Sequence, residues 1–198
     1  RHVEDWGGLE VGKTTRKAVA SLRGFGKVAT HYDAIGLGAA VKAETNRLIE
    51  IGEINSSSLT FHPWVAGGKV LNPEHHVIRD ENGAQDVKSP KNKDHFANLK
   101  AQAWYELAMR FYRTFRAVTE GITYDVATLI SIPSDLPGKR KLMDELSQAT
   151  FDTDSRTSKV VVNKSPNGTR SPNEADSCVM AFWPVGTGEA FYTKENVG

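Results

Sequence analysis

Residues 27–39 read KVATHYDAIGLGA, a strand-to-helix transition with an acidic residue in its middle. Residues 27–32 are predicted to form a short strand, which places Asp33 at its carboxyl-terminal edge. Gly36-Leu37-Gly38 then opens a helix, predicted over residues 39–51 from its spacing of apolar side chains. The stretch therefore predicts a strand, an acidic residue at its end, and a helix.

The same alternation continues on both sides. Residues 11–22 carry apolar side chains at helical spacing and are followed by Gly24 and Gly26, which predicts a helix that stops there. Residues 1–6 resemble the end of a strand, and residues 58–61 (SLTF) predict another. This β-α-β-α-β order favours an α/β fold in which at least part of the sheet is parallel.

The character of the sequence changes over residues 63–93. Turn signals are frequent there and apolar periodicity is weak, so we expect an inserted hairpin or loop that protrudes from the core and is partly mobile. Residues 77–83 are expected to be one arm of a hairpin that turns at Asn82-Gly83.

The clearest helix follows this insertion. Its start is predicted at Asp94 as the capping residue, and its end at about Val118. The apolar positions recur every three or four residues, which predicts that the helix lies against the sheet; they are Phe96, Leu99, Ala103, Leu107, Phe111 and Phe115.

The remaining chain predicts a short helix around residues 141–147 and two strands within residues 151–163. Ser171-Pro172-Asn173-Glu174 has the form of a capping box with proline in the first turn, which predicts a last helix from Ser171. We expect one domain over residues 1–183 and a tail over residues 184–198.

Composition excludes several classes of protein. Of the 198 residues, 39% are hydrophobic, which is too many for a disordered chain. A single cysteine, Cys178, cannot form an internal disulfide, and no apolar run approaches the roughly 20 residues of a membrane helix. The first residues have no apolar core of the kind a signal peptide needs, so the expectation is a reduced cytosolic protein.

The net charge is only +1, which argues against a basic coat over the whole surface. Basic residues do cluster locally. One cluster holds Arg156, Lys159, Lys164 and Arg170 with no acid between them; two others are residues 139–141 and the set Arg110, Arg113 and Arg116. Each cluster indicates either contact with nucleic acid phosphates or a solvated surface.

Residues 7–14, GGLEVGKT, match the phosphate-binding loop of nucleotide hydrolases, with Lys13 as the charge that would contact phosphate. The preceding strand is charged, however, whereas a buried first strand in such proteins is apolar. A P-loop NTPase that uses Lys13 and Thr14 therefore remains an alternative.

Two aspartates are placed where a metal site would need them. Asp33 ends a strand, and Asp176 lies in the first turns of the last helix near Glu174. Carboxylates that converge from separate elements can bind Mg²⁺ or Mn²⁺ through oxygen. The alternative is that Asp33 caps the following helix and Asp176 is a solvated helix residue.

Three blocks of the sequence together resemble the C-terminal nuclease domain of tailed-phage terminase large subunits. They are residues 32–39 (YDAIGLGA), 96–104 (FANLKAQAW) and 171–176 (SPNEAD), which occur in the order and spacing of that family. Residues 155–162 resemble the hairpin before the family's last motif. The resemblance covers about residues 1–183.

The resemblance implies an α/β, RNase H-like mixed sheet flanked by helices and a two-metal endonuclease that cuts concatemeric viral DNA during packaging. Asp33 and Asp176 would be the catalytic, metal-binding acids for Mg²⁺ or Mn²⁺. The family's first aspartate lies upstream of the part matched by residues 1–6. Asp5 belongs to the following strand of the pattern, so that role is not assigned to it.

The same resemblance implies double-stranded DNA as substrate, held by Arg156, Lys159, Lys164 and Arg170. It also implies a terminase ATPase domain, a small terminase subunit and a portal as partners, in the host cytoplasm at the procapsid. A non-catalytic module that only docks DNA or a capsid component remains the other alternative.

Overall fold

The fold is seen in a computed structural model that describes residues 10–36, 38–78 and 84–184. These residues divide into two compact units, one up to Ala66 and the other containing Gly67–Trp183. The whole of the proposed opening strand, part of the phosphate-loop match, the Asn82-Gly83 turn and nearly all of the proposed tail lie outside the described residues. No helix in the described ranges is long and apolar enough to cross a membrane.

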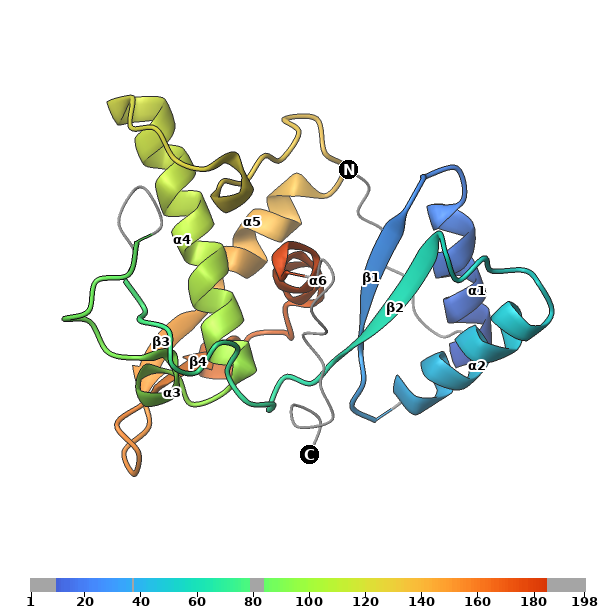
Figure 1. Ribbon diagram of the computed structural model, residues 1–198, viewed down its shortest axis with the longest axis horizontal. Coiled ribbons are helices and arrows are strands. Elements are labelled where there is room, and N and C mark those ends of the chain that lie inside the picture. The colour runs from blue at the N-terminus through green and yellow to red at the C-terminus, as the bar shows by residue number, and fades with distance from the viewer. Residues whose placement is uncertain (1–9, 37, 79–83, 185–198) are drawn as a thin grey trace. The chain divides into compact units, whose positions relative to one another are not determined.

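The first unit is built around two parallel strands. β1 (Val28–Asp33) pairs with β2 (Leu59–Trp64) in register from Val28↔Leu59 to Asp33↔Trp64. The connection between them contains α2 (Gly38–Glu50), and α1 (Val11–Leu22) precedes β1. The predicted helix–strand–helix–strand order of this unit is confirmed (Figure 1).

Alternation along β2 explains how this unit is held together. Leu59 and Phe61 lie two residues apart and therefore point to the same face of the sheet. On that face they pack against Val19 of α1, Leu48 of α2 and Ile54, which are all buried. The two helices thus cover one face of the strand pair.

The second unit is mostly helical. Its longest elements are α4 (Leu99–Glu120), α5 (Lys139–Gln148) and α6 (Asn173–Phe182); the others are α3 (Asn92–His95) and the one-turn helices Val126–Thr128 and Pro166–Gly168. β3 (Thr150–Thr153) and β4 (Val160–Asn163) form an antiparallel hairpin, as predicted for residues 151–163. Phe96 forms a parallel bridge with Val160 and is almost completely buried. The described strands therefore form one parallel and one antiparallel pair.

The long helix starts later than predicted. Asp94 lies in α3, and the chain is extended at Phe96 before α4 begins at Leu99. Asn98 is the N-cap, and its side chain accepts a hydrogen bond from the Ala101 amide at 3.0 Å. Prediction of the cap at Asp94 was wrong because two helical segments follow each other with only a short break.

The carboxyl-terminal half of α4 also departs from the prediction. Leu99, Ala103 and Leu107 are buried, as their spacing indicated. Phe115 and Val118 continue the same spacing but are 59% and 79% exposed. Apolar periodicity thus located the buried face of α4 without showing how far along the helix the core extends.

The described residues of the turn-rich stretch 63–93 make more regular contacts than their sequence suggested. A hairpin is present: His76 bridges to Lys91, the Val77 amide donates to the Pro90 carbonyl, and the Asp86 amide donates to the Ile78 carbonyl. Val77 is buried against Phe96 and Ala101. The inserted hairpin is therefore confirmed, but its base belongs to the core of this unit.

Two buried amide side chains, one in α3 and one in α4, form hydrogen bonds with the backbone of residues 71 and 72. Asn92 donates through Nδ2 to the carbonyls of Leu71 and Asn72, at 3.1 and 3.0 Å. Gln102 of α4 donates to the Leu71 carbonyl and accepts from the Leu71 amide, at 3.0 and 2.7 Å. These bonds pair the two buried amide side chains with backbone groups of Leu71 and Asn72.

Replacing Asn92 by alanine should therefore destabilise the protein. The variant would lose two hydrogen bonds made by a buried side chain, which together contribute about 1–3 kcal/mol to the free energy of unfolding. Urea unfolding measures this directly, with Lys88→Ala at an exposed position as the control, expected within about 0.5 kcal/mol of the wild type. An Asn92→Ala variant as stable as the control would show that the segment is not fastened in this way.

Candidate functional site

Asp33 is placed where the sequence predicted, at the carboxyl end of a strand. It is the last residue of β1, and the Ala34 amide continues the strand pairing by donating to the Trp64 carbonyl at 2.9 Å. The Asp33 side chain is exposed, and its Oδ1 accepts a hydrogen bond from the Ile35 amide at 3.0 Å. This bond forms a local turn and stabilises the carboxylate position.

A glycine holds the next helix close to Asp33. Gly38 is the first residue of α2, and a Cβ built there would lie 2.3 Å from the Asp33 carbonyl oxygen. Such an overlap is with backbone, so no side-chain rotation can relieve it. Gly38 therefore has a packing reason: only glycine lets α2 begin this close to the end of β1.

Asp176 lies in the first turn of α6 and is paired with a lysine. Its Oδ2 contacts the ammonium group of Lys164, which follows β4 directly. The two side chains are 26% and 32% exposed, so the pair is partly withdrawn from water. The interpretation of Asp176 as a solvated helix residue is therefore not supported.

Three further charged side chains meet at the start of α6. Lys141 of α5 lies 2.9 Å from Glu174 Oε1 and 3.8 Å from Glu145 Oε1. Glu145 in turn accepts hydrogen bonds from the amides of Glu174 and Ala175, at 2.7 and 3.0 Å. The sequence did not indicate Glu145, because no local pattern shows that a residue of α5 accepts hydrogen bonds from the first turn of α6.

The predicted capping box at Ser171 is wrong. The N-cap of α6 is Pro172, which offers no side-chain hydrogen bond, and the helix begins at Asn173. The Glu174 side chain is directed to Lys141, so it does not return to the backbone of Ser171 as a capping box requires.

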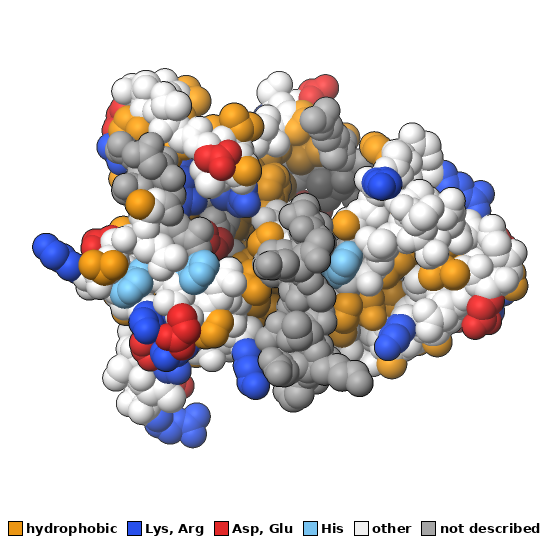
Figure 2. Space-filling view, in the orientation of Figure 1, with side chains coloured by type: hydrophobic (Ala, Val, Ile, Leu, Met, Phe, Trp, Pro, Cys, Tyr) orange, Lys and Arg blue, Asp and Glu red, His pale blue; other side chains and the backbone are white. Residues whose placement is uncertain are grey.

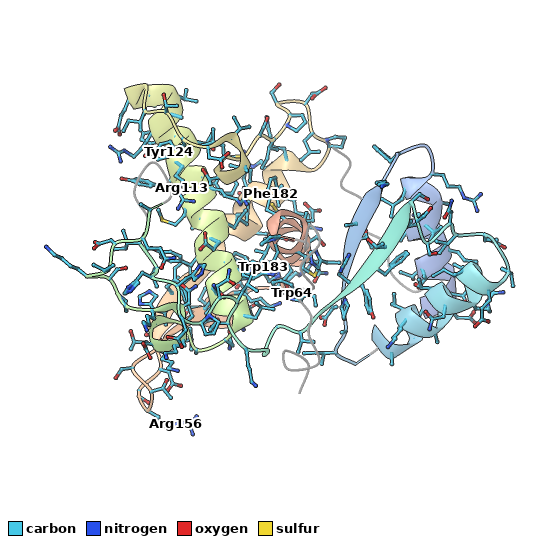
Figure 3. All side chains as sticks on the ribbon, in the orientation of Figure 1. Trp64, Arg113, Tyr124, Arg156, Phe182 and Trp183 are labelled. Carbon is cyan, nitrogen blue, oxygen red and sulfur yellow. The ribbon has the colours of Figure 1, made fainter. Side chains whose placement is uncertain are left out.

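The four basic residues proposed to bind DNA do not form one patch. Arg156 lies at the tip of the β3–β4 hairpin, well away from α6, as Figure 3 shows. Lys164 is held by Asp176, and the Arg170 carbonyl accepts a bond from Gln148 at 2.9 Å. On the face drawn in Figure 2, lysine and arginine side chains are scattered over the described surface.

Another basic cluster has a structural role. Arg110 donates to the carbonyls of Ala127 and Leu129, at 2.5 and 3.1 Å, and its guanidinium lies 5.8 Å from the centre of the Phe182 ring. Burial lowers the pKa of this guanidinium from its ordinary value. Arg110 thereby ties α4 to the segment that follows it and to α6.

The described part of the phosphate-loop match is helical. Residues 11–14 belong to α1, and the Thr14 amide donates to the Glu10 carbonyl at 3.0 Å. Lys13 is exposed and lies 3.7 Å from Glu10. An amide engaged within the helix is not offered to a phosphate, which weakens the NTPase alternative.

The two candidate metal ligands come from different units, Asp33 from the first and Asp176 from the second. Within the described residues, no group of three or more His, Cys, Asp or Glu side chains is arranged to hold a metal ion. Convergence of the two aspartates therefore stays a prediction.

Comparison with known proteins shows the fold. No protein-family profile and no curated protein sequence matches the chain. Among solved structures, the nuclease domain of the large terminase subunit of bacterial virus Sf6, as a lysine-to-alanine variant with manganese and beta-thujaplicinol, is 22% identical with a TM-score of 0.71. That match covers 93% of this chain and 77% of that one.

Two further structures of the Sf6 domain agree. The unsubstituted nuclease domain is 24% identical, with a TM-score of 0.61, over 89% of this chain and 72% of that one. A lysine-to-alanine variant with calcium is 24% identical, with a TM-score of 0.61, over 88% and 71%. The chain thus has the RNase H-like α/β fold of a phage terminase nuclease domain, as its sequence predicted.

The close approach of Gly38 to Asp33 generates a prediction. Gly38→Ala should lower the free energy of unfolding by about 1–3 kcal/mol, because the new methyl group overlaps the Asp33 carbonyl. Gly12→Ala, also in a helix but with its nearest built contact at 3.6 Å, should be neutral or stabilise by up to about 1 kcal/mol. Equal stability of the two variants in urea unfolding would refute the packing argument.

Proposed function

We propose that this protein is the nuclease domain of a viral DNA-packaging terminase and hydrolyses DNA phosphodiester bonds with divalent metal ions. The observation that carries the proposal is the fold match over 93% of the chain to a domain crystallised with manganese. The two sequence-predicted acids support it, since Asp33 ends β1 and Asp176 lies in the first turn of the last described helix.

The chemistry of the two acids suits the proposed metal. Both offer carboxylate oxygens, the ligands that Mg²⁺ and Mn²⁺ prefer. The ammonium of Lys164 now pairs with the Asp176 carboxylate, so a metal ion bound there would take over this pairing. The residues present therefore fit a hard divalent cation.

Asp33 and Asp176 would bind the metal, and Lys164 would compensate the negative charge of Asp176 when no metal is bound. A bound divalent cation lowers the pKa of a coordinated water and stabilises the charge of a leaving oxygen. Lys164 neutralises Asp176 in the arrangement seen here. When Asp176 has another cation as partner, the Lys164 ammonium is free to contact a DNA phosphate.

The proposed substrate is double-stranded DNA, contacted through its phosphates. Lys164 and Arg170 flank the path from β4 to α6, while Arg156 and Lys159 belong to the preceding hairpin. Contacts of this kind carry little sequence preference and weaken with salt. The hairpin tip would then contact DNA at a distance from Asp176.

By the same resemblance we propose a terminase ATPase domain, a small terminase subunit and the portal as partners, at the procapsid in the host cytoplasm. The chain would supply the cut that separates packaged DNA from a concatemer. A P-loop NTPase and a non-catalytic DNA-docking or capsid-docking module are the alternatives that the following experiment separates.

The proposal predicts that Asp33→Ala and Asp176→Ala each abolish Mn²⁺-dependent cleavage. A metal ligand contributes several kcal/mol to stabilisation of the transition state. Losing about 3 kcal/mol of it lowers the cleavage rate at least about 100-fold, which leaves no visible product on the gel. Plasmid cleavage is followed on gels, and Mn²⁺ binding by titration calorimetry on the same samples.

Two variants serve as controls. Asp144→Ala removes an exposed acid of α5, and Lys13→Ala removes the lysine of the phosphate-loop match; both should cleave DNA and bind Mn²⁺ like the wild type. Mn²⁺ binding that survives both Asp33→Ala and Asp176→Ala would contradict the proposal. Binding without cleavage in the wild type would favour the docking module, and ATP binding lost in Lys13→Ala would favour the NTPase.

A further inference from the structure

The helix that carries Asp176 lacks a cap of its own. Its N-cap is Pro172, which has no side-chain acceptor, so the first amides of α6 need partners from elsewhere. The Asn173 amide donates to the Ser171 carbonyl at 3.1 Å, and the Asp176 amide donates to the Pro172 carbonyl at 2.8 Å. The amides of Glu174 and Ala175, which lie between them, have no such local acceptor.

Glu145 supplies both missing bonds from another helix. A single oxygen, Oε2, accepts from the Glu174 amide at 2.7 Å and from the Ala175 amide at 3.0 Å. The Glu145 side chain is only 13% exposed, and its other oxygen lies 3.8 Å from Lys141. This carboxylate thus caps α6 in the way that an N-cap side chain normally does, although it belongs to α5.

The capped turn is the one that presents Asp176. Ala175 is completely buried and cannot shift without disturbing the packing of α6. Asp176 is the next residue, and its carboxylate is fixed at the far end by Lys164. The position of the Asp176 carboxylate therefore depends on the backbone that Glu145 holds.

We propose that Glu145 is a positioning residue of the metal site: by capping the first turn of α6 across the α5–α6 contact, it sets where the Asp176 carboxylate lies. The inference rests on the proposed function of Asp176 as a metal ligand. It assigns Glu145 no contact with metal or DNA.

Two substitutions separate position from charge. Glu145→Gln keeps the length of the side chain, and its amide oxygen can accept both hydrogen bonds, but the charge is lost. Glu145→Asp keeps the charge but is one methylene shorter, so its carboxylate falls short of the two amides. If Glu145 acts by positioning, the Glu145→Gln variant retains Mn²⁺ affinity and the Glu145→Asp variant loses it.

The measurement is Mn²⁺ affinity by titration calorimetry, together with the melting temperature of each variant. Glu145→Asp should weaken Mn²⁺ binding by about 10-fold, the low end of the effect of groups that orient metal ligands, while Glu145→Gln stays within about 3-fold of the wild type. Asn98→Ala, which removes the side-chain cap of α4, is the matched control: it should lower the melting temperature without changing Mn²⁺ affinity.

The outcomes separate this inference from the proposed function. Unchanged Mn²⁺ affinity in Glu145→Asp, loss in Glu145→Gln alone, or an equal loss in Asn98→Ala would overturn the positioning role. If Asp176→Ala binds Mn²⁺ like the wild type, the proposed metal site itself fails. If Asp176→Ala loses Mn²⁺ affinity while Glu145→Asp keeps it, the proposed metal site stands and only the positioning role of Glu145 is overturned.

Discussion

Charge compensation around the first turn of α6 is the constraint on which the candidate site depends. Three carboxylates meet there, from Glu145, Glu174 and Asp176, and two ammonium groups, from Lys141 and Lys164, lie among them. Carboxylates withdrawn from water need cations or hydrogen-bond donors nearby. The packing of α5 on α6 and the path of the chain from β4 supply both, so the fold of this unit and the position of Asp176 are linked.

Local sequence signals were sufficient where local interactions decide the structure. The limits of α1 were predicted at residues 11–22 as observed, because glycines follow an apolar helical pattern there. The end of β1 at Asp33 and the start of α2 near Gly38 were also visible, since strand-forming residues give way to glycine. The two predicted strands within residues 151–163 are present as β3 and β4.

Contacts between distant segments explain what the sequence did not reveal. Ser171 has the right residue type for a cap, yet Glu145 on α5 takes that role for α6. Phe115 has the right spacing for a buried position, yet its side chain is 59% exposed because no distant segment of the described chain covers it. The pairing of Lys164 with Asp176 follows from the turn between β4 and α6, which no local pattern specifies.

The central proposal is that the carboxylates of Asp33 and Asp176 bind the same divalent metal ions. Crystals soaked in Mn²⁺ test it most directly, because anomalous scattering locates the ions independently of the fold. The account predicts carboxylate oxygens of both residues at coordination distance from a single manganese cluster. Manganese bound elsewhere, or at only one of the two aspartates, would contradict it.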